Sequence, residues 1–185
     1  MIELSNVTLG YAHKTVLQSL TFTFPERGVV GVLGSSGVGK TTLFKLLLGR
    51  IQPDSGRVSG LAGKRVSVVF QEDRLLSHLS ALENVTLVND GRDALPWLSA
   101  MQLREVANEP ISALSGGMQR RVAIARALHY GGDILLLDEP FKGLDDALRE
   151  SILPAIKQAF PLIIVALHEQ HEARAFGCDT VLTLH

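Results

Sequence analysis

The segment GVVGVLGSSGVGKTTLFKLLLG, residues 28–49, decides the fold of this chain. Its first part, Gly28 to Leu33, is apolar without alternation, which is typical of a strand buried on both faces of a parallel sheet. Gly34 to Thr41 then fits the pattern G-x-x-x-x-G-K-[ST], a loop whose backbone N–H groups wrap a di- or triphosphate. The leucine-rich residues 43–48 predict a helix that ends at Gly49. A strand, a glycine-rich loop and a helix in this order begin a β-α-β unit.

The loop pattern gives its residues distinct chemical roles. Glycines are needed because the loop takes backbone conformations that a Cβ would oppose and because the backbone approaches the anion closely. The ammonium of Lys40 is expected to neutralise the β and γ phosphates, and the hydroxyl of Thr41 to bind Mg²⁺. The helix that follows adds the positive end of its dipole. We therefore expect the nucleotide to contact Gly34, Ser35, Ser36, Gly37, Val38, Gly39, Lys40, Thr41 and Thr42.

Two carboxylates follow a second apolar strand, predicted over Ile134–Leu137. Ligands of open α/β sheets bind at the carboxyl ends of the strands, where Asp138 and Glu139 stand. Taken alone, the segment is equally compatible with a strand that ends in solvated acids. Beside a phosphate loop, we expect Asp138 to hold Mg²⁺, directly or through water, and Glu139 to polarise the water that attacks the γ phosphate.

A third glycine-rich feature is Leu114-Ser115-Gly116-Gly117-Met118-Gln119. Ser115 is a natural N-cap, and the helix after it presents free N–H groups and the positive end of its dipole. The chain therefore carries a second helix N-terminus suited to an anion.

Together these motifs resemble the ATP-binding subunits of ABC transporters, whose signature sequence is L-S-G-G-Q or a near variant, and the resemblance covers essentially the whole chain. It implies that Tyr11 stacks on adenine, although an exposed hairpin tyrosine is otherwise unremarkable. It implies that Gln71 touches Mg²⁺ and the attacking water, and that Asp145 lies in a loop crossing a dimer interface. His168, a residue type that at a strand end is more often structural, is implied to contact the γ phosphate.

The resemblance also implies a mechanism with partners. Two copies would sandwich two ATP molecules, so that Ser115, Gly116, Gly117 and Gln119 of one copy face the phosphate loop of the other. Lys40, Gln71, Glu139 and His168 would then serve hydrolysis. ATP would close the dimer and hydrolysis would open it, driving a separate membrane permease that works with a periplasmic or lipid-anchored solute-binding protein.

The type of transporter is implied by a shorter segment. Val69–Leu76, followed by Leu82–Val85, is similar to importers of the nitrate, sulfonate, taurine and thiamine-precursor group. Many of those proteins have Pro-Trp where this chain has Ser77 and His78. Arg120 and Arg121, just after the signature, are expected to form either a solvated helix face or contacts with the partner.

Length and composition set the outer limits. The chain has 185 residues, against roughly 150 for a typical domain, so we expect a single domain over residues 1–185. The fold class is α/β, with a P-loop NTPase core, a mostly parallel sheet, an N-terminal antiparallel hairpin of Ile2–Leu9 and Leu17–Phe24, and a short helical subdomain inserted at about 77–130. A formal net charge of -1 provides no field for gripping nucleic acid.

The remaining features fit an intracellular ATPase without settling its partners. No apolar run reaches the length of a membrane span and the N-terminus lacks signal-peptide features, so we expect a cytoplasmic protein attached peripherally to a membrane through the permease. Cys178 is expected to pack without a disulfide or metal. The few residues after His168 predict reduced C-terminal elements without an appended regulatory domain.

Two other functions stay open at this point. A soluble ABC-type ATPase uncoupled from transport would normally carry a long coiled-coil insertion or tandem ATP domains. A nucleotide-sensing module without catalysis would lack some of the chemical groups named above.

Overall fold

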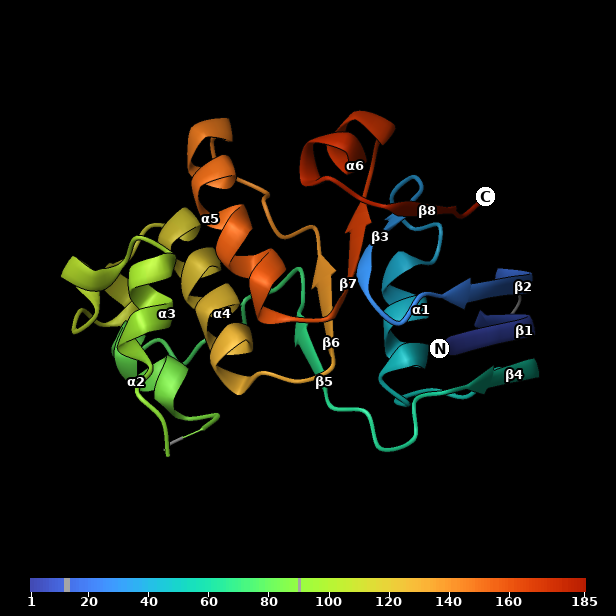
Figure 1. Cartoon of the computed structure of the whole chain (residues 1–185), viewed down its shortest axis with the longest axis horizontal. Coiled ribbons are helices and arrows are strands. Elements are labelled where there is room, and N and C mark those ends of the chain that lie inside the picture. Colours follow the sequence, from blue (N-terminus) through green and yellow to red (C-terminus); the bar gives the residue numbers. More distant parts are fainter. Residues whose placement is uncertain (12–13, 90) are drawn as a thin grey trace.

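The computed structural model describes residues 1–11, 14–89 and 91–185, and its larger sheet is parallel throughout (Figure 1). The strand order is β5-β6-β7-β3-β8. These strands are β3 (Gly28–Leu33), β5 (Val66–Val69), β6 (Ile134–Asp138), β7 (Leu162–Leu167) and β8 (Thr180–Thr183). The prediction of a mostly parallel sheet is confirmed, and the phosphate-loop strand β3 lies between β7 and β8.

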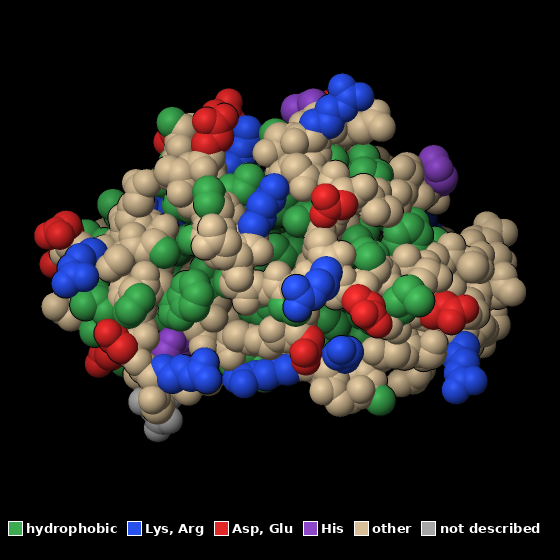
Figure 2. Space-filling model, viewed as in Figure 1, with side chains coloured by type: hydrophobic (Ala, Val, Ile, Leu, Met, Phe, Trp, Pro, Cys, Tyr) green, Lys and Arg blue, Asp and Glu red, His purple; other side chains and the backbone are tan. Residues whose placement is uncertain are grey.

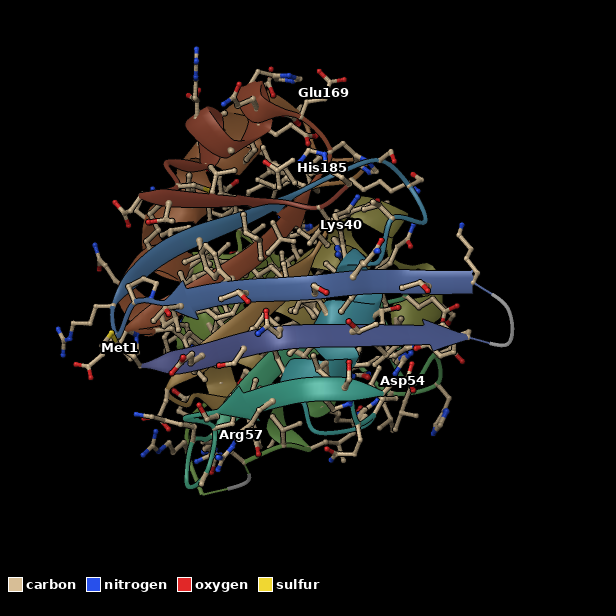
Figure 3. The ribbon with its side chains drawn as sticks, turned by 90° about the vertical axis from the view of Figure 1, so that its right-hand side faces the viewer. Met1, Lys40, Asp54, Arg57, Glu169 and His185 are labelled. Atoms are coloured by element: carbon tan, nitrogen blue, oxygen red, sulfur yellow. The ribbon has the colours of Figure 1, made fainter. Side chains whose placement is uncertain are left out.

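A smaller antiparallel sheet contains the predicted hairpin, β1 (Ile2–Tyr11) and β2 (Lys14–Phe24). The polar segment Gly10–Lys14 predicts the turn between them, but Gly10 and Tyr11 end β1 and Lys14 begins β2, while residues 12 and 13 lie outside the described residues. A strand that the sequence analysis missed, β4 (Ser55–Ser59), pairs with the other edge of β1, giving the order β2-β1-β4. In Figure 3 this sheet faces the viewer, and the labelled Asp54 precedes β4, where its carboxylate accepts a 2.8 Å hydrogen bond from the backbone N–H of Gly10.

Most of the helices lie on the opposite side of the parallel sheet from the antiparallel one (Figure 1). α2 (Ala81–Thr86) begins with the expected capping box, in which Ser80 and Glu83 each accept a backbone hydrogen bond from the other. The long α4 (Gly116–Tyr130) packs against α2 and α3. The remaining helices are α1 (Lys40–Leu47), α3 (Leu95–Ala100), α5 (Asp146–Ala159), which continues through Pro154, and α6 (Gln170–Phe176), with 3-10 turns at Arg104–Val106 and Ile111–Ala113.

The core is divided in two by the parallel sheet. Along β6, Leu135 and Leu137 join the cluster under the helices, while Ile134 and Leu136 join the cluster between the two sheets. This period of two is that of a strand with both faces buried. α1 contributes Leu43, Phe44, Leu46 and Leu47 to the cluster between the sheets, which fixes the helix that follows the phosphate loop.

The structure corrects the expectation for Arg120 and Arg121. Neither forms a solvated helix face, because their exposed fractions are 4% and 8%. The guanidinium of Arg121 donates to the carbonyls of Met101 and Gln102, at 2.7 and 3.2 Å, and so ties α4 to the end of α3. Both arginines are therefore built into the interior.

The surface charge is mixed, and the one cysteine is partly buried. Figure 2 shows acidic and basic side chains interspersed on one face, as a net charge of -1 suggests. Cys178 has a free thiol in the described structure and packs beside the helical-side core, and burial raises the pKa of this thiol to about 11. Within the described residues no helix has the length and apolar character needed to cross a bilayer.

The pairing of β4 with β1 gives a test of the fold. Gly56 has a φ of 82°, and a Cβ there would overlap the carbonyl of Asn6 on β1. Gly63 has a similar φ of 74° but nothing within 4 Å of a Cβ. We expect Gly63→Ala to lower the free energy of unfolding by about 1 kcal/mol, from backbone strain alone.

Gly56→Ala should lower the free energy of unfolding by about 3 kcal/mol, since the overlap adds to the same strain. In thermal unfolding this corresponds to a fall in Tm of roughly 6–12 °C, against roughly 2–4 °C for the Gly63 control. Equal losses for the two variants would contradict the close approach of β4 to β1.

Candidate functional site

A cavity of about 900 Å³ opens at the carboxyl end of the parallel sheet. It is lined by residues that follow strands far apart in the sequence. Among the predicted site residues, those in its wall are Tyr11, Ser36, Gly37, Gly39, Lys40, Thr41, Thr42, Gln71, Asp138, Glu139 and His168.

The strand order explains why these residues meet. Gln71 comes after β5, Asp138 is the last residue of β6 and Glu139 the next residue. His168 comes directly after β7, and the phosphate loop comes directly after β3. These strands are neighbours in the order β5-β6-β7-β3, and they are parallel, so their carboxyl ends share one edge. The edge therefore collects the loop, the acidic pair, the glutamine and the histidine in one place.

The last glycine of the phosphate loop, Gly39, packs closely against β2. Gly39 has a φ of 120°, and a Cβ there would lie 2.7 Å from Cγ1 of Val16 on β2. Only glycine fits both the backbone conformation and this close approach. α1 then begins at Lys40, with the first intrahelical bond running from the N–H of Leu43 to the carbonyl of Gly39 at 2.8 Å.

Lys40 is held by the loop that it follows. Its side chain is 5% exposed, and Nζ donates to the carbonyl oxygens of Gly34 and Ser35 at 2.5 and 3.2 Å. Gly34, Ser35 and Val38 are not among the described residues in the cavity wall, and the first two act here through these carbonyls. The Lys40 ammonium is thus held by the backbone of the loop.

Thr41, in the first turn of α1, lies against Asp138, the last residue of β6. Thr41 Oγ1 donates to Asp138 Oδ2 at 2.8 Å, and the Asp138 carboxylate is 2% exposed. Burial raises the pKa of Asp138, against the opposing effects of the Thr41 hydrogen bond and the Lys40 and Arg120 charges, while the charge of Glu139 raises it further.

These groups fit Mg²⁺. The hydroxyl of Thr41, a carboxylate of Asp138 and the amide of Gln71 offer oxygen ligands, which this ion prefers. A cation would also offset the cost of burying the Asp138 charge. Among the described residues no group of three or more His, Cys, Asp or Glu side chains is arranged to hold a metal ion. Mg²⁺ usually keeps several waters and binds phosphate oxygens beside one or two carboxylates.

Glu139 and His168 form the second contact of the site. His168 Nε2 lies 2.8 Å from Glu139 Oε1, and the two side chains are 37% and 17% exposed. The backbone N–H of His168 donates to Glu172 Oε2 at 2.7 Å, which ties the histidine to the first turn of α6. Glu139 has a φ of 48°, in the left-handed region that is unfavourable for a residue with a side chain. The carboxylate thus faces the cavity at the cost of backbone strain.

Tyr11 lies at the end of β1, 47% exposed and paired with Lys14 of β2. Both residues line the cavity, so the tyrosine is available to a ligand there. Its stacking on a base stays a prediction.

The signature residues do not join this cavity. Ser115, Gly116, Gly117, Gln119 and Asp145 are absent from the described residues of its wall. Ser115 caps α4 as predicted, accepting from the N–H of Met118, and Asp145 caps α5, accepting from Leu148. The amide nitrogen of Gln119 donates to the carbonyls of Ile111 and Leu114, so this part of its side chain is engaged within the chain. Their contact with a nucleotide stays a prediction.

Some residues of the site escaped the sequence analysis. Lys142 and Arg149 add positive charge to the cavity wall, and Phe141 and Phe176 add a stacked aromatic pair with ring centroids 5.3 Å apart. No spacing pattern marks them, because they reach the site through the fold of the segments after β6 and β7. Arg120, which lies beneath this edge of the sheet, has no sequence signal beyond its place after the signature.

Comparison with known proteins shows the family to which the chain belongs. A family model described as ABC transporter matches residues 17–142. The chain is 34% identical to the hypophosphite import ATP-binding protein HtxD of Stutzerimonas stutzeri, over 95% of this chain and 62% of that protein. It is 34% identical to the thiamine import ATP-binding protein ThiQ of a Jannaschia species, over 100% of this chain and 89% of that protein. A solved dimer of an ATP-binding cassette in a post-hydrolysis state, bound to ADP and Pi, has a TM-score of 0.85 at 27% identity, over 100% of this chain and 94% of that one.

The buried carboxylate of Asp138 leads to a stability prediction. Because the pKa of Asp138 is raised in the folded protein, ionisation of this carboxyl disfavours the fold, so stability is lost as the pH rises above the ordinary pKa of an aspartate. Asp138→Asn keeps an acceptor for Thr41 and removes the charge. We expect it to raise the Tm of the nucleotide-free protein at pH 7, with a smaller gain at pH 4.5.

Asp133→Asn serves as the control for this substitution. Asp133 stands just before the same strand, half-buried, and accepts a 2.8 Å hydrogen bond from the N–H of Arg65. Because the Asp133 carboxylate is less buried, removing its charge relieves a smaller desolvation cost. The Tm of Asp133→Asn should therefore not rise. A Tm for Asp138→Asn that is unchanged or lowered at pH 7 would refute the cost assigned to the Asp138 charge.

Proposed function

Because the chain belongs to the ABC transporter family, whose ATP-binding proteins are ATPases, we propose that it binds and hydrolyses ATP to power solute uptake through a separate permease. The observation that carries the proposal is the pairing of two contacts in one cavity, Thr41 with Asp138 and Glu139 with His168. The first contact gathers ligands for a cation, and the second joins an acid to a histidine at the place where the γ phosphate would lie.

The chemistry follows from these residues. Lys40 and the N–H groups at the start of α1 bind the phosphate oxygens. Mg²⁺, when bound, neutralises charge on the β and γ phosphates. Glu139 accepts a proton from the water that attacks the γ phosphorus, and the bond to the β–γ bridging oxygen breaks to leave ADP and phosphate. Contact with His168 keeps the Glu139 carboxylate directed into the cavity.

Hydrolysis requires a second copy of the chain in this proposal. Ser115 and Gly116 are exposed and lie outside the cavity wall, so the positive N-terminus of α4 cannot serve the nucleotide in its own copy. In a dimer, α4 of one copy would place these N–H groups on the phosphates bound by the other. The dimeric ATP-binding cassette that is similar to this chain supports the arrangement.

Uptake rests on the names of the relatives. HtxD and ThiQ are named import ATP-binding proteins, and their substrates differ chemically. The choice of transported solute is therefore made by the permease and a solute-binding protein rather than by this chain. The segment between Gln71 and α2 has an exposed leucine, Leu76, at 45%, and would dock on the permease at the cytoplasmic face of the membrane.

A single substitution tests hydrolysis. Glu139→Gln removes the proton acceptor and keeps the shape of the side chain, so kcat should fall by about 10²–10⁴-fold. ATP binding should be retained, and the variant should run as a dimer in Mg²⁺ and ATP on size exclusion with light scattering. Glu150→Gln, an exposed residue on α5, should hydrolyse at the wild-type rate.

The concentration dependence of the rate separates the alternatives. A rate per chain that rises with protein concentration supports the dimer, whereas full activity of a monomer would contradict it. Binding of ATP by the wild type without any Mg²⁺-dependent turnover would favour a nucleotide sensor instead.

A further inference from the structure

Arg120 lies in the second turn of α4 and is buried beneath the catalytic edge, at 4% exposure. Every nitrogen of its guanidinium has an acceptor. Nη2 donates to the carbonyls of Asp138 and Glu139 at 2.5 and 3.0 Å, and Nε donates to the carbonyl of Pro140 at 3.1 Å. One planar group thus binds three consecutive carbonyls around the residue proposed to activate water.

Those carbonyls belong to the strained part of the backbone. Glu139 has a φ of 48°, a conformation that is unfavourable for a residue with a side chain and persists only when its surroundings hold it. On the strand side, the N–H of Glu139 donates to the carbonyl of Ala166 at 3.2 Å. Arg120 supplies the restraint on the opposite side, where its fork matches the row of carbonyls.

The guanidinium is anchored away from Glu139 as well. Nη1 donates to the carbonyl of Phe70 and to Asp73 Oδ1, the latter at 2.9 Å. Arg126, also on α4, donates to the carbonyls of Asp73 and Arg74 at 2.8 and 2.9 Å, so the segment that carries the anchor is itself held. Gln71 lies between the two anchors, on the same segment.

We propose that Arg120 is a positioning residue for hydrolysis, which holds the backbone of Glu139 in the strained conformation that directs its carboxylate into the cavity. The proposal rests on the proposed ATPase function. Arg120 itself is not among the described residues of the cavity wall and therefore acts through Glu139 rather than on the nucleotide. Loss of the guanidinium should slow the chemical step and leave ATP binding unchanged.

The experiment measures kcat, KM, the Kd for ATP and Tm for the full chain carrying Arg120→Gln or Arg120→Lys. For Arg120→Gln we expect kcat to fall about tenfold or more, with KM and Kd within about twofold of wild type, because a small displacement of a catalytic group is costly. Arg120→Lys keeps the charge but lacks the planar fork, so its kcat should lie between that of Arg120→Gln and that of the wild type.

Asn84→Ala is the control for a merely structural effect. Asn84 is fully buried on α2 and its amide exchanges hydrogen bonds with the backbone of Leu76, Leu79 and Ser80, away from the cavity. We expect this variant to lose Tm and to keep the wild-type kcat at temperatures where it is folded. If Arg120→Gln does not fold, two milder variants test the proposal: Arg120→Lys, and Asp73→Ala, which removes only the Asp73 carboxylate that Arg120 Nη1 contacts. In both we expect a lower kcat with an unchanged KM.

A double-mutant cycle with Glu139→Gln identifies the route of the effect. If Arg120 acts through Glu139, adding Arg120→Gln to Glu139→Gln should lower the residual rate no further. Multiplicative losses, or a wild-type kcat in folded Arg120 variants, would overturn the proposal while leaving the ATPase function intact. Full hydrolysis by Glu139→Gln alone would overturn both.

Discussion

The contact between Thr41 and Asp138, which join segments that are not adjacent in the sheet, is the interaction on which the cation site depends. β3, which leads into the loop, and β6, which ends at Asp138, are not neighbours, because β7 lies between them. Two strand spacings amount to about 10 Å, yet Thr41 Oγ1 and Asp138 Oδ2 are 2.8 Å apart. The loop and the start of α1 bridge this spacing. The second contact has a different origin: β6 and β7 are neighbours, with Asp138 opposite Ala166, so Glu139 and His168 follow adjacent strand ends and meet there.

The site is assembled from polar groups that the fold buries at a cost. Asp138 is a buried carboxylate, Lys40 a buried ammonium and Arg120 a buried guanidinium. Each is satisfied chiefly by backbone carbonyls or a hydroxyl rather than by a charge of opposite sign beside it, with Asp73 as the exception at Arg120. Such an arrangement orients the groups firmly and leaves the charges of Lys40 and Asp138, which line the cavity, available to a polyanion and its cation. Burying these polar groups lowers the stability of the protein, but it places them where they can serve the site.

Much of this architecture could be predicted from the sequence, because the strongest signals are local. The loop at Gly34–Thr41 and the acids after Ile134–Leu137 stand at the ends of continuous apolar runs, and the parallel sheet follows from them. β4 could not be predicted, since Ser-Gly-Arg-Val-Ser has no apolar alternation and forms a strand only because the edge of β1 is there to pair with. Arg120 was misjudged for a related reason. Arginine on a helix is normally placed in solvent, and only the fold reveals the row of carbonyls at the end of β6 that receives it.

The position of β3 in the sheet has a consequence for synthesis of the chain on the ribosome. Its neighbours are β7 and β8, formed by Leu162–Leu167 and Thr180–Thr183. When residues 28–49 leave the exit tunnel, the partners of this apolar strand have not yet been made. The hairpin β1–β2 can form early from local contacts, whereas the parallel sheet must wait for pairings between distant segments, which are slow to form. The nascent chain therefore carries the apolar β3 without a sheet partner until translation has passed β7, and this interval is where a chaperone would be needed most.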